Sequence, residues 1–198
     1  MSEIFKFVIL HGTYGNPKEN WFPWLKEKLE SLGHEVVAPK LPTPRNQSVE
    51  NWDEALQKQA PWTFGKNTVL IGHSLGATYM LNILNRDRPE SVSASFFVSG
   101  FLHDLGDDHF DKLNHSFTHQ DFDFEKIKKY AGEVFVIAGD NDPYVPMIET
   151  EELASRLSVE PMIIKGGGHL NAEAGYIEFS ELLEKIEKIF GEKNEKPA

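Results

Sequence analysis

The pentapeptide Gly72-His73-Ser74-Leu75-Gly76 constrains this chain more than any other feature of its sequence. It follows a short apolar run at 68–71 and precedes a segment of helical character, which predicts that Ser74 lies at a sharp corner between a strand and a helix. Such a corner is a nucleophile elbow, which strains the serine backbone and exposes its side chain. Glycines are needed two residues to either side because a Cβ there would strike a neighbouring strand or helix.

A serine nucleophile requires a histidine to take its proton and a carboxylate to orient that histidine. An expected buried strand at 134–138 is followed by a turn-rich segment that carries Asp140 and Asp142. Another expected strand, at 161–164, is followed by Gly166-Gly167-Gly168-His169, a flexible loop that can bring the imidazole to Ser74. Because ligand chemistry in open parallel sheets gathers at the carboxyl ends of strands, His169 is the predicted general base and both aspartates are candidates for the acid.

Two other histidines lie near the predicted nucleophile in sequence or in the expected fold. His73 precedes Ser74 and is expected to point away from the pocket, where it packs or forms hydrogen bonds near the sheet. His11 follows the first expected strand and is expected to support the first loop. We therefore interpret both as structural residues.

Strand-like apolar runs alternate with segments of helical spacing along the chain. Strands are expected at 5–10, 35–38, 68–71, 93–98, 134–138 and 161–164, and helices at about 21–32, 49–60, 75–86, 147–157 and 175–190. This alternation predicts an α/β fold with a mostly parallel sheet of about six strands and helices on both faces. We expect a single domain over 1–190 and a flexible C-terminal tail over 191–198.

Composition narrows the classes of protein to which the chain can belong. Its 198 residues are 40% hydrophobic, which suffices for one large core. The absence of cysteine excludes disulfides, thiolate metal sites and a cysteine nucleophile, and it fits a reducing cytoplasm. A formal net charge of −11 argues against a nucleic-acid partner. Since no apolar stretch approaches the ~20 residues that span a bilayer, we expect a cytoplasmic protein without a membrane partner, and no feature indicates an oligomeric state.

The segment from 101 to 126, here called the lid segment, is rich in histidine and aspartate. The histidines and aspartates of this segment are His103, Asp104, Asp107, Asp108, His109, Asp111, His115, His119, Asp121 and Asp123. We expect a short lid or loop excursion close to the opening of the active site. Imidazole and carboxylate also suit zinc or manganese, but no H-E-x-x-H pattern occurs, and a solvated acidic lid accounts for the composition without a metal.

Several motifs together resemble a known family. They are His11-Gly12 after the first expected strand, Asn20-Trp21-Phe22-Pro23-Trp24-Leu25, the elbow at 72–76, Asp142-x-x-Val145-Pro146 and Gly167-Gly168-His169. The chain resembles the small serine hydrolases of the retinoblastoma-binding-protein-like family, particularly its bacterial YdeN group. The match runs through most of the chain and is far more specific than the elbow alone.

The resemblance implies a compact α/β-hydrolase with a minimal cap and a catalytic Ser74, Asp142 and His169. The spacing Asp142-x-x-Val145-Pro146 is similar to the acid loop of the family and favours Asp142 over Asp140, which is left to cap the turn or bond nearby amides. Vertebrate relatives are named for binding retinoblastoma protein through an L-x-C-x-E motif. Because this chain has no cysteine, that partner role is not expected here.

The predicted chemistry also needs a hole for the oxyanion and a pocket for the acyl group. The backbone amides of Leu75 and Thr13 are the expected oxyanion donors, and the resemblance supports this pair; Tyr14 is the alternative to Thr13. A shallow pocket is expected to be walled by Tyr14, Phe101, Leu102 and Tyr144.

These residues together predict a serine hydrolase that cleaves small carboxylic esters, with amides as a second choice, through an acyl-enzyme and without a cofactor. Two alternatives from other classes stay open. One is a protein-interaction module on a hydrolase scaffold, since a fold does not fix a function. The other is a metal-assisted hydrolase that uses the histidines and aspartates of the lid segment.

Overall fold

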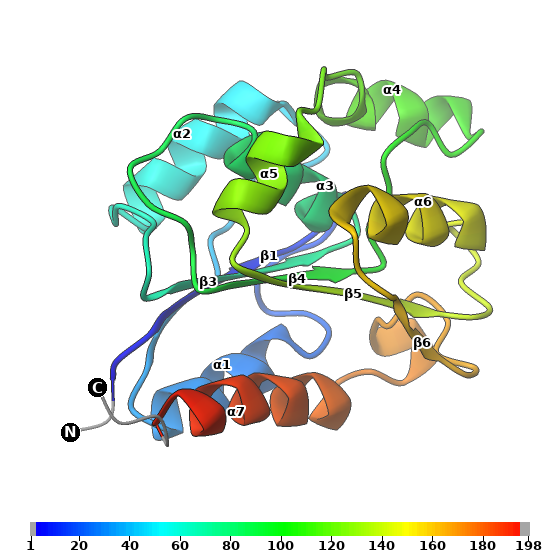
Figure 1. Cartoon of the computed structure of the whole chain (residues 1–198). Helices are drawn as coiled ribbons and strands as arrows, with labels where there is room; N and C mark the ends of the chain where they lie inside the picture. The colour runs from blue at the N-terminus through cyan, green and yellow to red at the C-terminus, as the bar shows by residue number, and fades with distance from the viewer. Residues whose placement is uncertain (1–2, 195–198) are drawn as a thin grey trace.

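The computed structural model describes residues 3–194 and is built around an all-parallel sheet of six strands (Figure 1). In chain order the strands are β1 Lys6–Leu10, β2 Glu35–Val37, β3 Thr68–His73, β4 Ala94–Val98, β5 Glu133–Gly139 and β6 Met162–Ile164. They are ordered β2-β1-β3-β4-β5-β6 across the sheet. The predicted parallel sheet is confirmed, and each strand overlaps the apolar run that predicted it.

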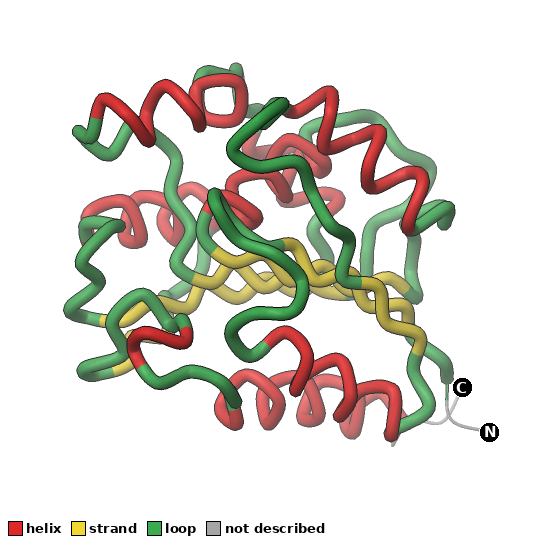
Figure 2. Tube along the Cα trace, turned by 180° about the vertical axis from the view of Figure 1, so that it is seen from behind, coloured by secondary structure: helices red, strands yellow, loops and turns green. Residues whose placement is uncertain are grey.

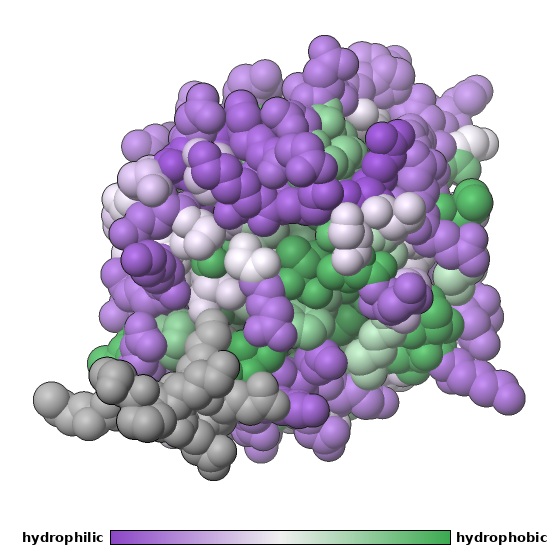
Figure 3. Space-filling model, in the orientation of Figure 1, coloured by the Kyte–Doolittle hydropathy of each residue, from purple (hydrophilic) through white to green (hydrophobic). Residues whose placement is uncertain are grey.

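Helices cover both faces of this sheet (Figures 1 and 2). Their bounds are α1 Phe22–Ser31, α2 Val49–Gln59, α3 Leu75–Leu84, α4 Asp108–Thr118, α5 Phe124–Tyr130, α6 Met147–Leu157 and α7 Ser180–Asn194, with a 3₁₀ turn, η1, at Ala172–Ala174. Helices α1 and α7 lie on one face and the remaining helices on the other. Polar side chains cover the outside of the larger layer, while apolar side chains gather at the level of the sheet (Figure 3).

Each face of the sheet carries its own hydrophobic core. Successive side chains of a strand point to opposite faces, so the adjacent residues Phe96 and Phe97 of β4 enter different cores. Phe96 belongs to the same core as Trp21, on the side of α1 and α7, and Phe97 belongs to the same core as Trp52, on the other side. Strands buried on both faces explain why the sequence shows continuous apolar runs instead of alternation.

The strand order places the switch point of the sheet between β1 and β3. From β1 the chain passes outward to β2, and it then returns to β3 on the opposite side of β1. Leu10 at the end of β1 is in register with Gly72 near the end of β3, so the loops that follow these strands start side by side. Ligands of open α/β sheets bind in the crevice at such a point, which here lies between the first loop and the elbow.

The lid segment contains α4 and the start of α5, two helices that the sequence did not predict. Asp107 caps α4 by accepting hydrogen bonds from the amides of His109 and Phe110, and Asp123 caps α5 by accepting one from the amide of Lys126. Aspartate is a preferred helix N-cap, so these two residues have a local structural use. Helix α5 is part of the layer that covers the sheet, because its Ile127 is fully buried in the core. This stretch thus forms packed helices and not an irregular loop, and its expected use as a lid stays a prediction.

The C-terminal part also differs in its boundaries. Helix α7 begins at Ser180, whereas helical spacing predicted a start near 175, because Asn171 caps η1 and Gly175 adopts a positive φ of 92° after it. The helix runs through Asn194 into the tail expected over 191–198, and the rest of that tail lies outside the described residues. Among the residues described, no helix has the length and apolar character to cross a bilayer.

Candidate active site

Ser74 occupies the corner between β3 and α3, with φ 56° and ψ −126°. A side chain rarely adopts such a positive φ, and the strain costs about 1–3 kcal/mol unless the surroundings enforce it. The flanking glycines provide that enforcement. A Cβ on Gly76 would lie 2.2 Å from the carbonyl oxygen of Leu10, and one on Gly72 would lie 2.6 Å from the backbone of Gly76. The expected reason for both glycines is confirmed.

His169 and Asp142 form a close, largely buried pair. The Nδ1 of His169 lies 2.7 Å from the Oδ2 of Asp142, and their side chains are only 9% and 3% exposed. Because a carboxylate can only accept, Nδ1 carries the hydrogen, and Nε2 keeps the lone pair that a general base needs.

The surroundings of Asp142 keep it ionised. Burial alone would favour the neutral acid, but the hydrogen bond and charge of His169 and the amides of Val145 and Tyr144 outweigh burial and hold the pKa of Asp142 below its ordinary value. Both amides donate to Oδ1, at 3.0 and 2.9 Å, which leaves Oδ2 for the imidazole. A permanently charged acid can both orient His169 and stabilise its imidazolium.

Three consecutive side chains of the acid loop, at 140–142, bond to the loop at 166–172 that carries His169, here called the histidine loop. Asp140 accepts from the amide of Gly166, Asn141 accepts from the amide of Gly168, and Asp142 accepts from the ring of His169, each at 2.7 Å. Of the two candidate acids, Asp142 contacts the imidazole, while Asp140 bonds a nearby amide. The loop that the sequence predicted to be flexible is thus tied down along its length.

His73 connects this pair to the elbow. Its Nε2 lies 2.8 Å from the carbonyl oxygen of His169, and the two rings pack with centroids 4.8 Å apart. A carbonyl oxygen only accepts, so His73 is a neutral donor at Nε2. Burial, and then the neighbouring His169, lower the pKa of His73 to about 3. The expectation that His73 bonds near the sheet is correct, and its partner is the backbone of the candidate base.

Two residues of the segment at 20–25 also hold the histidine loop, a role that sequence reasoning missed. The indole of Trp21 donates to the carbonyl oxygen of Leu170 at 2.9 Å, and the side chain of Asn20 accepts from the amide of Ala172 at 2.9 Å. Leu170 has a positive φ of 49°, so its backbone needs such support. In the sequence, only the family motif at 20–25 could have indicated that these two residues have a role near the site.

The first loop lies directly against the candidate nucleophile. A Cβ on Gly12 would lie 2.8 Å from the Cβ and 3.1 Å from the Oγ of Ser74. His11, whose pKa is lowered mainly by burial, donates from Nδ1 to the carbonyl of Gly12 and accepts at Nε2 from the amide of Leu41. Both ring nitrogens are engaged, which fits the expected supporting role of His11.

The amide hydrogen bonds distinguish the two candidates for the second oxyanion donor. The amide of Tyr14 donates to the hydroxyl of Thr43 at 2.8 Å. Within residues 3–194, the amides of Thr13 and Leu75 have no hydrogen-bond acceptor in the protein. An oxyanion hole requires amides that no protein acceptor occupies, so this pattern favours Thr13 over Tyr14.

Comparison with known proteins now gives the family. A family model described as serine hydrolase matches residues 7–188. The chain belongs to this serine hydrolase family. YdeN of Bacillus subtilis (strain 168), named as a hydrolase, is 30% identical over 169 residues, covering 85% of this chain and 87% of YdeN. The serine hydrolase RBBP9 of Rattus norvegicus is 26% identical over 192 residues, covering 96% of this chain and 97% of RBBP9.

Solved structures agree with this assignment to the serine hydrolase family. The crystal structure of the ydeN gene product from B. subtilis has a TM-score of 0.86 at 27% identity, covering 94% of this chain and 99% of that one. The expected α/β-hydrolase fold is thereby confirmed. A structure from work on carboxylesterases of Nitrososphaera gargenis has a TM-score of 0.68 at 14% identity, covering 98% and 94% of the two chains, and it shares the fold.

The four residues expected to wall the pocket of this serine hydrolase fall into two groups. Tyr14 and Tyr144 are 49% and 47% exposed, and the ring of Tyr144 packs against that of His169 with centroids 5.0 Å apart. Phe101 and Leu102 are only 2% and 4% exposed and belong to the core. The two tyrosines are therefore the pocket candidates with side chains available to a ligand.

The histidines and aspartates of the lid segment pair separately. His119 bonds Asp104 at 2.9 Å, and His103 bonds Glu149 of α6 at 3.1 Å. Among the described residues, no group of three or more histidine, aspartate or glutamate side chains gathers as a metal site would require.

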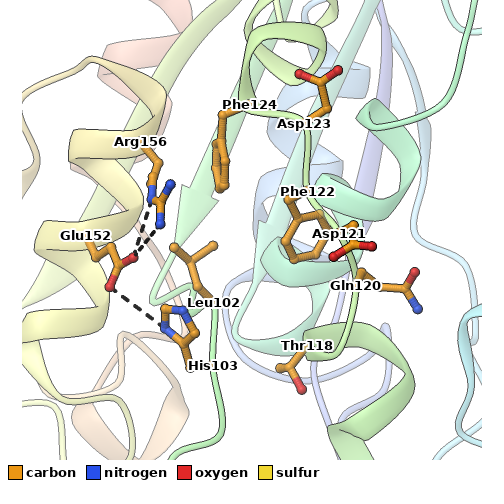
Figure 4. Close-up of a pocket in the computed structure, with 10 residues that line it drawn as sticks. All are labelled: Leu102, His103, Thr118, Gln120, Asp121, Phe122, Asp123, Phe124, Glu152 and Arg156. Carbon is orange, nitrogen blue, oxygen red and sulfur yellow. Dashed lines mark hydrogen bonds and ion pairs between the residues drawn. The ribbon is translucent and has the colours of Figure 1, made fainter.

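A cavity of about 390 Å³ opens between the lid segment and α6 (Figure 4). Its walls include Leu102, Phe122 and Phe124, and Glu152 joins His103 to Arg156 across one side. Within the described part of the chain, Ser74, Asp142 and His169 do not line this cavity. The expected pocket residue Leu102 thus faces a cavity separate from the candidate triad.

Proposed function

We propose that this serine hydrolase cleaves small carboxylic esters through an acyl-enzyme formed on Ser74. His169 takes the proton of the Ser74 hydroxyl as its Oγ attacks the ester carbonyl, and the protonated imidazole then gives that proton to the leaving alcohol. Asp142 orients the ring and balances its transient charge. His169 next activates a water molecule that attacks the acyl-enzyme, which releases the carboxylic acid and restores the serine.

The observation that carries the proposal is the hydrogen bond of 2.7 Å between His169 and ionised Asp142, held to the elbow through His73. It leaves the lone pair of His169 at Nε2, as a general base requires. The strained backbone of Ser74 supports its role as the nucleophile. The free amides of Leu75 and Thr13 are the proposed donors to the oxyanion.

Small acyl groups are proposed because little of the chain is available to cover them. The proposed pocket is walled on the exposed side by Tyr14 and Tyr144, while Phe101 and Leu102 are committed to the core. Each buried methylene contributes up to about 0.8 kcal/mol, so a deep apolar tunnel would raise kcat/KM steeply with acyl length. We expect no such rise here.

A series of p-nitrophenyl esters tests this proposal. We expect kcat/KM to reach its maximum at acyl lengths of about C2–C6 and to fall beyond them. A maximum at C12 or longer would contradict the small-ester assignment.

Covalent labelling separates the proposal from its two alternatives. A fluorophosphonate probe should label the wild type and leave Ser74→Ala unlabelled, and EDTA should change neither labelling nor turnover. A protein-interaction module would show no Ser74-dependent labelling. Loss of turnover in EDTA that added zinc restores would instead support metal-assisted hydrolysis.

A further inference from the structure

We infer that Asn114 of α4, together with Gln47, is a positioning residue for the first loop, at 11–15, here called the oxyanion loop. Helix α4 then acts as a fixed support for the reaction. The inference rests on the proposed function, because it concerns the amide of Thr13 that would bind the oxyanion. It changes the expected role of the lid segment, part of which holds the catalytic backbone in place.

The side chain of Thr13 is held by two buried or half-buried amide groups. Its hydroxyl donates to the Oδ1 of Asn114 at 2.7 Å, and Asn114 is only 3% exposed. The Nε2 of Gln47 donates to the same Oδ1 at 2.9 Å and to the hydroxyl of Thr13 at 3.2 Å. The three side chains therefore form a closed set of hydrogen bonds, although Thr13 and Asn114 are 101 residues apart in the sequence.

The same network also holds the backbone amide of Tyr14, the residue that follows Thr13. Thr43 donates from its hydroxyl to the Oε1 of Gln47 at 2.6 Å and accepts from the amide of Tyr14 at 2.8 Å. Tyr14 has a positive φ of 59°, a conformation that its surroundings must enforce. With the side chain of Thr13 held on one side and the following amide on the other, the backbone of Thr13 has little freedom to turn its own N–H.

Helix α4 can serve as this support because it is attached to the body of the protein. Phe117 is fully buried, and its carbonyl accepts from the side chain of Asn82 in α3 at 3.1 Å. The hydroxyl of Ser116 accepts from the amide of Val49 at 3.3 Å. These contacts lie within one turn of Asn114, so the position of α4 is set by the core.

A positioned donor acts mainly in the transition state, where the charge on the oxyanion develops. Loss of its support should therefore lower kcat and leave KM nearly unchanged. A general loosening of the pocket would instead raise KM. This split distinguishes a positioning role from a merely structural one.

The test compares Asn114→Ala, Thr13→Val and their double mutant, using p-nitrophenyl acetate turnover and the Kd of phenylboronic acid, which forms a tetrahedral adduct on an active serine. Each single change should lower kcat about 10–100-fold, keep KM within about twofold and raise the boronate Kd by a factor similar to the kcat loss. The double mutant should lose no more than about the larger single loss, since both changes break the hydrogen bond between Thr13 and Asn114.

Two variants serve as matched controls. Thr13→Ser keeps the hydroxyl that bonds Asn114 and should restore most of the kcat that Thr13→Val loses. His115→Ala changes an exposed side chain of α4 that forms none of the contacts holding α4 to the core or to the oxyanion loop, and it should leave kcat unchanged. If Asn114→Ala does not fold, the comparison of Thr13→Val with Thr13→Ser decides the question alone.

Unchanged kcat in Thr13→Val, a loss confined to KM, or fully multiplicative losses in the double mutant would overturn the inference. Failure of the proposed function would look different: the wild type itself would show no ester turnover that depends on Ser74. A wild type with Ser74-dependent turnover and an unaffected Thr13→Val would refute only the role of the network.

Discussion

The ring of His73 donates from Nε2 to the carbonyl oxygen of His169 over 2.8 Å, so the residue before the candidate nucleophile holds the candidate base. This contact spans 96 residues of sequence and is buried. The hydroxyl of Ser99 also approaches the same carbonyl oxygen, at 3.4 Å. The position of the imidazole thus depends on its backbone as well as on Asp142.

Replacing His73 should therefore impair the reaction without touching the triad. We expect His73→Ala to lower kcat/KM for p-nitrophenyl acetate about 10–100-fold, because displacement of a catalytic group by about 1 Å can cost that much. His115→Ala, an exposed histidine of α4, is the control and should retain full activity. Equal activity in the two variants would show that the carbonyl contact is unimportant.

The lowered pKa of His73 predicts a loss of stability in mild acid. In the folded protein His73 stays neutral down to a pKa of about 3, while in the unfolded chain it takes up a proton near the ordinary histidine pKa of 6.5. Stability is therefore complete above about pH 6.5 and declines as the pH falls towards 3, by about 2 kcal/mol at pH 5 from this residue. Urea unfolding at pH 7.5 and 5.0 measures the decline.

The matched variant for this measurement is His73→Gln, which keeps a side-chain donor but does not titrate. Its free energy of unfolding should fall by about 2 kcal/mol less than that of the wild type between the two pH values. His11, whose pKa is also lowered, remains in both proteins and cancels in the comparison. An identical decline in both proteins would contradict the assignment.

The proposed triad predicts large and similar losses for its two reacting members. Ser74→Ala and His169→Ala should each lower ester turnover about 10⁴–10⁶-fold, because the residues act as a unit. Circular dichroism and thermal unfolding should show a retained fold. Substantial activity in either purified variant would refute the mechanism.

The two aspartates of the acid loop should differ strongly. Asp142→Asn should cost about 10⁴-fold in kcat, because an amide neither stabilises the imidazolium nor enforces the required tautomer. Asp140→Asn should cost less than about tenfold, since its Oδ1 can still accept from Gly166. A reversed ranking of the two kcat values would move the acid to Asp140.

Trp21 offers a test of the support for the histidine loop. Trp21→Phe keeps an aromatic ring in the core but removes the donor to the carbonyl of Leu170. We expect a loss of about 1–3 kcal/mol in the free energy of unfolding and a lower kcat, because a buried carbonyl loses its partner. Trp24→Phe is the matched control, because Trp24 lies on the same segment but does not bond Leu170, and it should change kcat little.

Local sequence was enough to predict the sheet and the elbow. Apolar runs of strand length mark strands buried on both faces, and Gly72 and Gly76 are demanded by backbone contacts within the elbow and with Leu10. The resemblance of Asp142-x-x-Val145-Pro146 to the acid loop of the family favoured the aspartate that contacts His169. These signals are short-range, so they can be read from adjacent residues.

Helix α4 was missed because aspartates and histidines obscure its apolar spacing, and α5 was missed because its 7 residues are too few to show a helical period. In α4 the buried positions are Asn114, Phe117 and Thr118, two of which are polar. Periodicity methods look for apolar residues on the buried face and therefore read this helix as loop. Only packing against α3 and the oxyanion loop reveals why a polar face is buried.

The sequence by itself determined the strands, the elbow and the identity of the candidate triad. Tertiary structure decided how those residues are held: His73 on His169, Asn20 and Trp21 on the histidine loop, and Asn114 on Thr13. Each of these bonds joins residues 96 to 152 positions apart. Such pairs leave no periodic or local signature in a single chain, because their partners become neighbours only when the sheet brings the strand ends together.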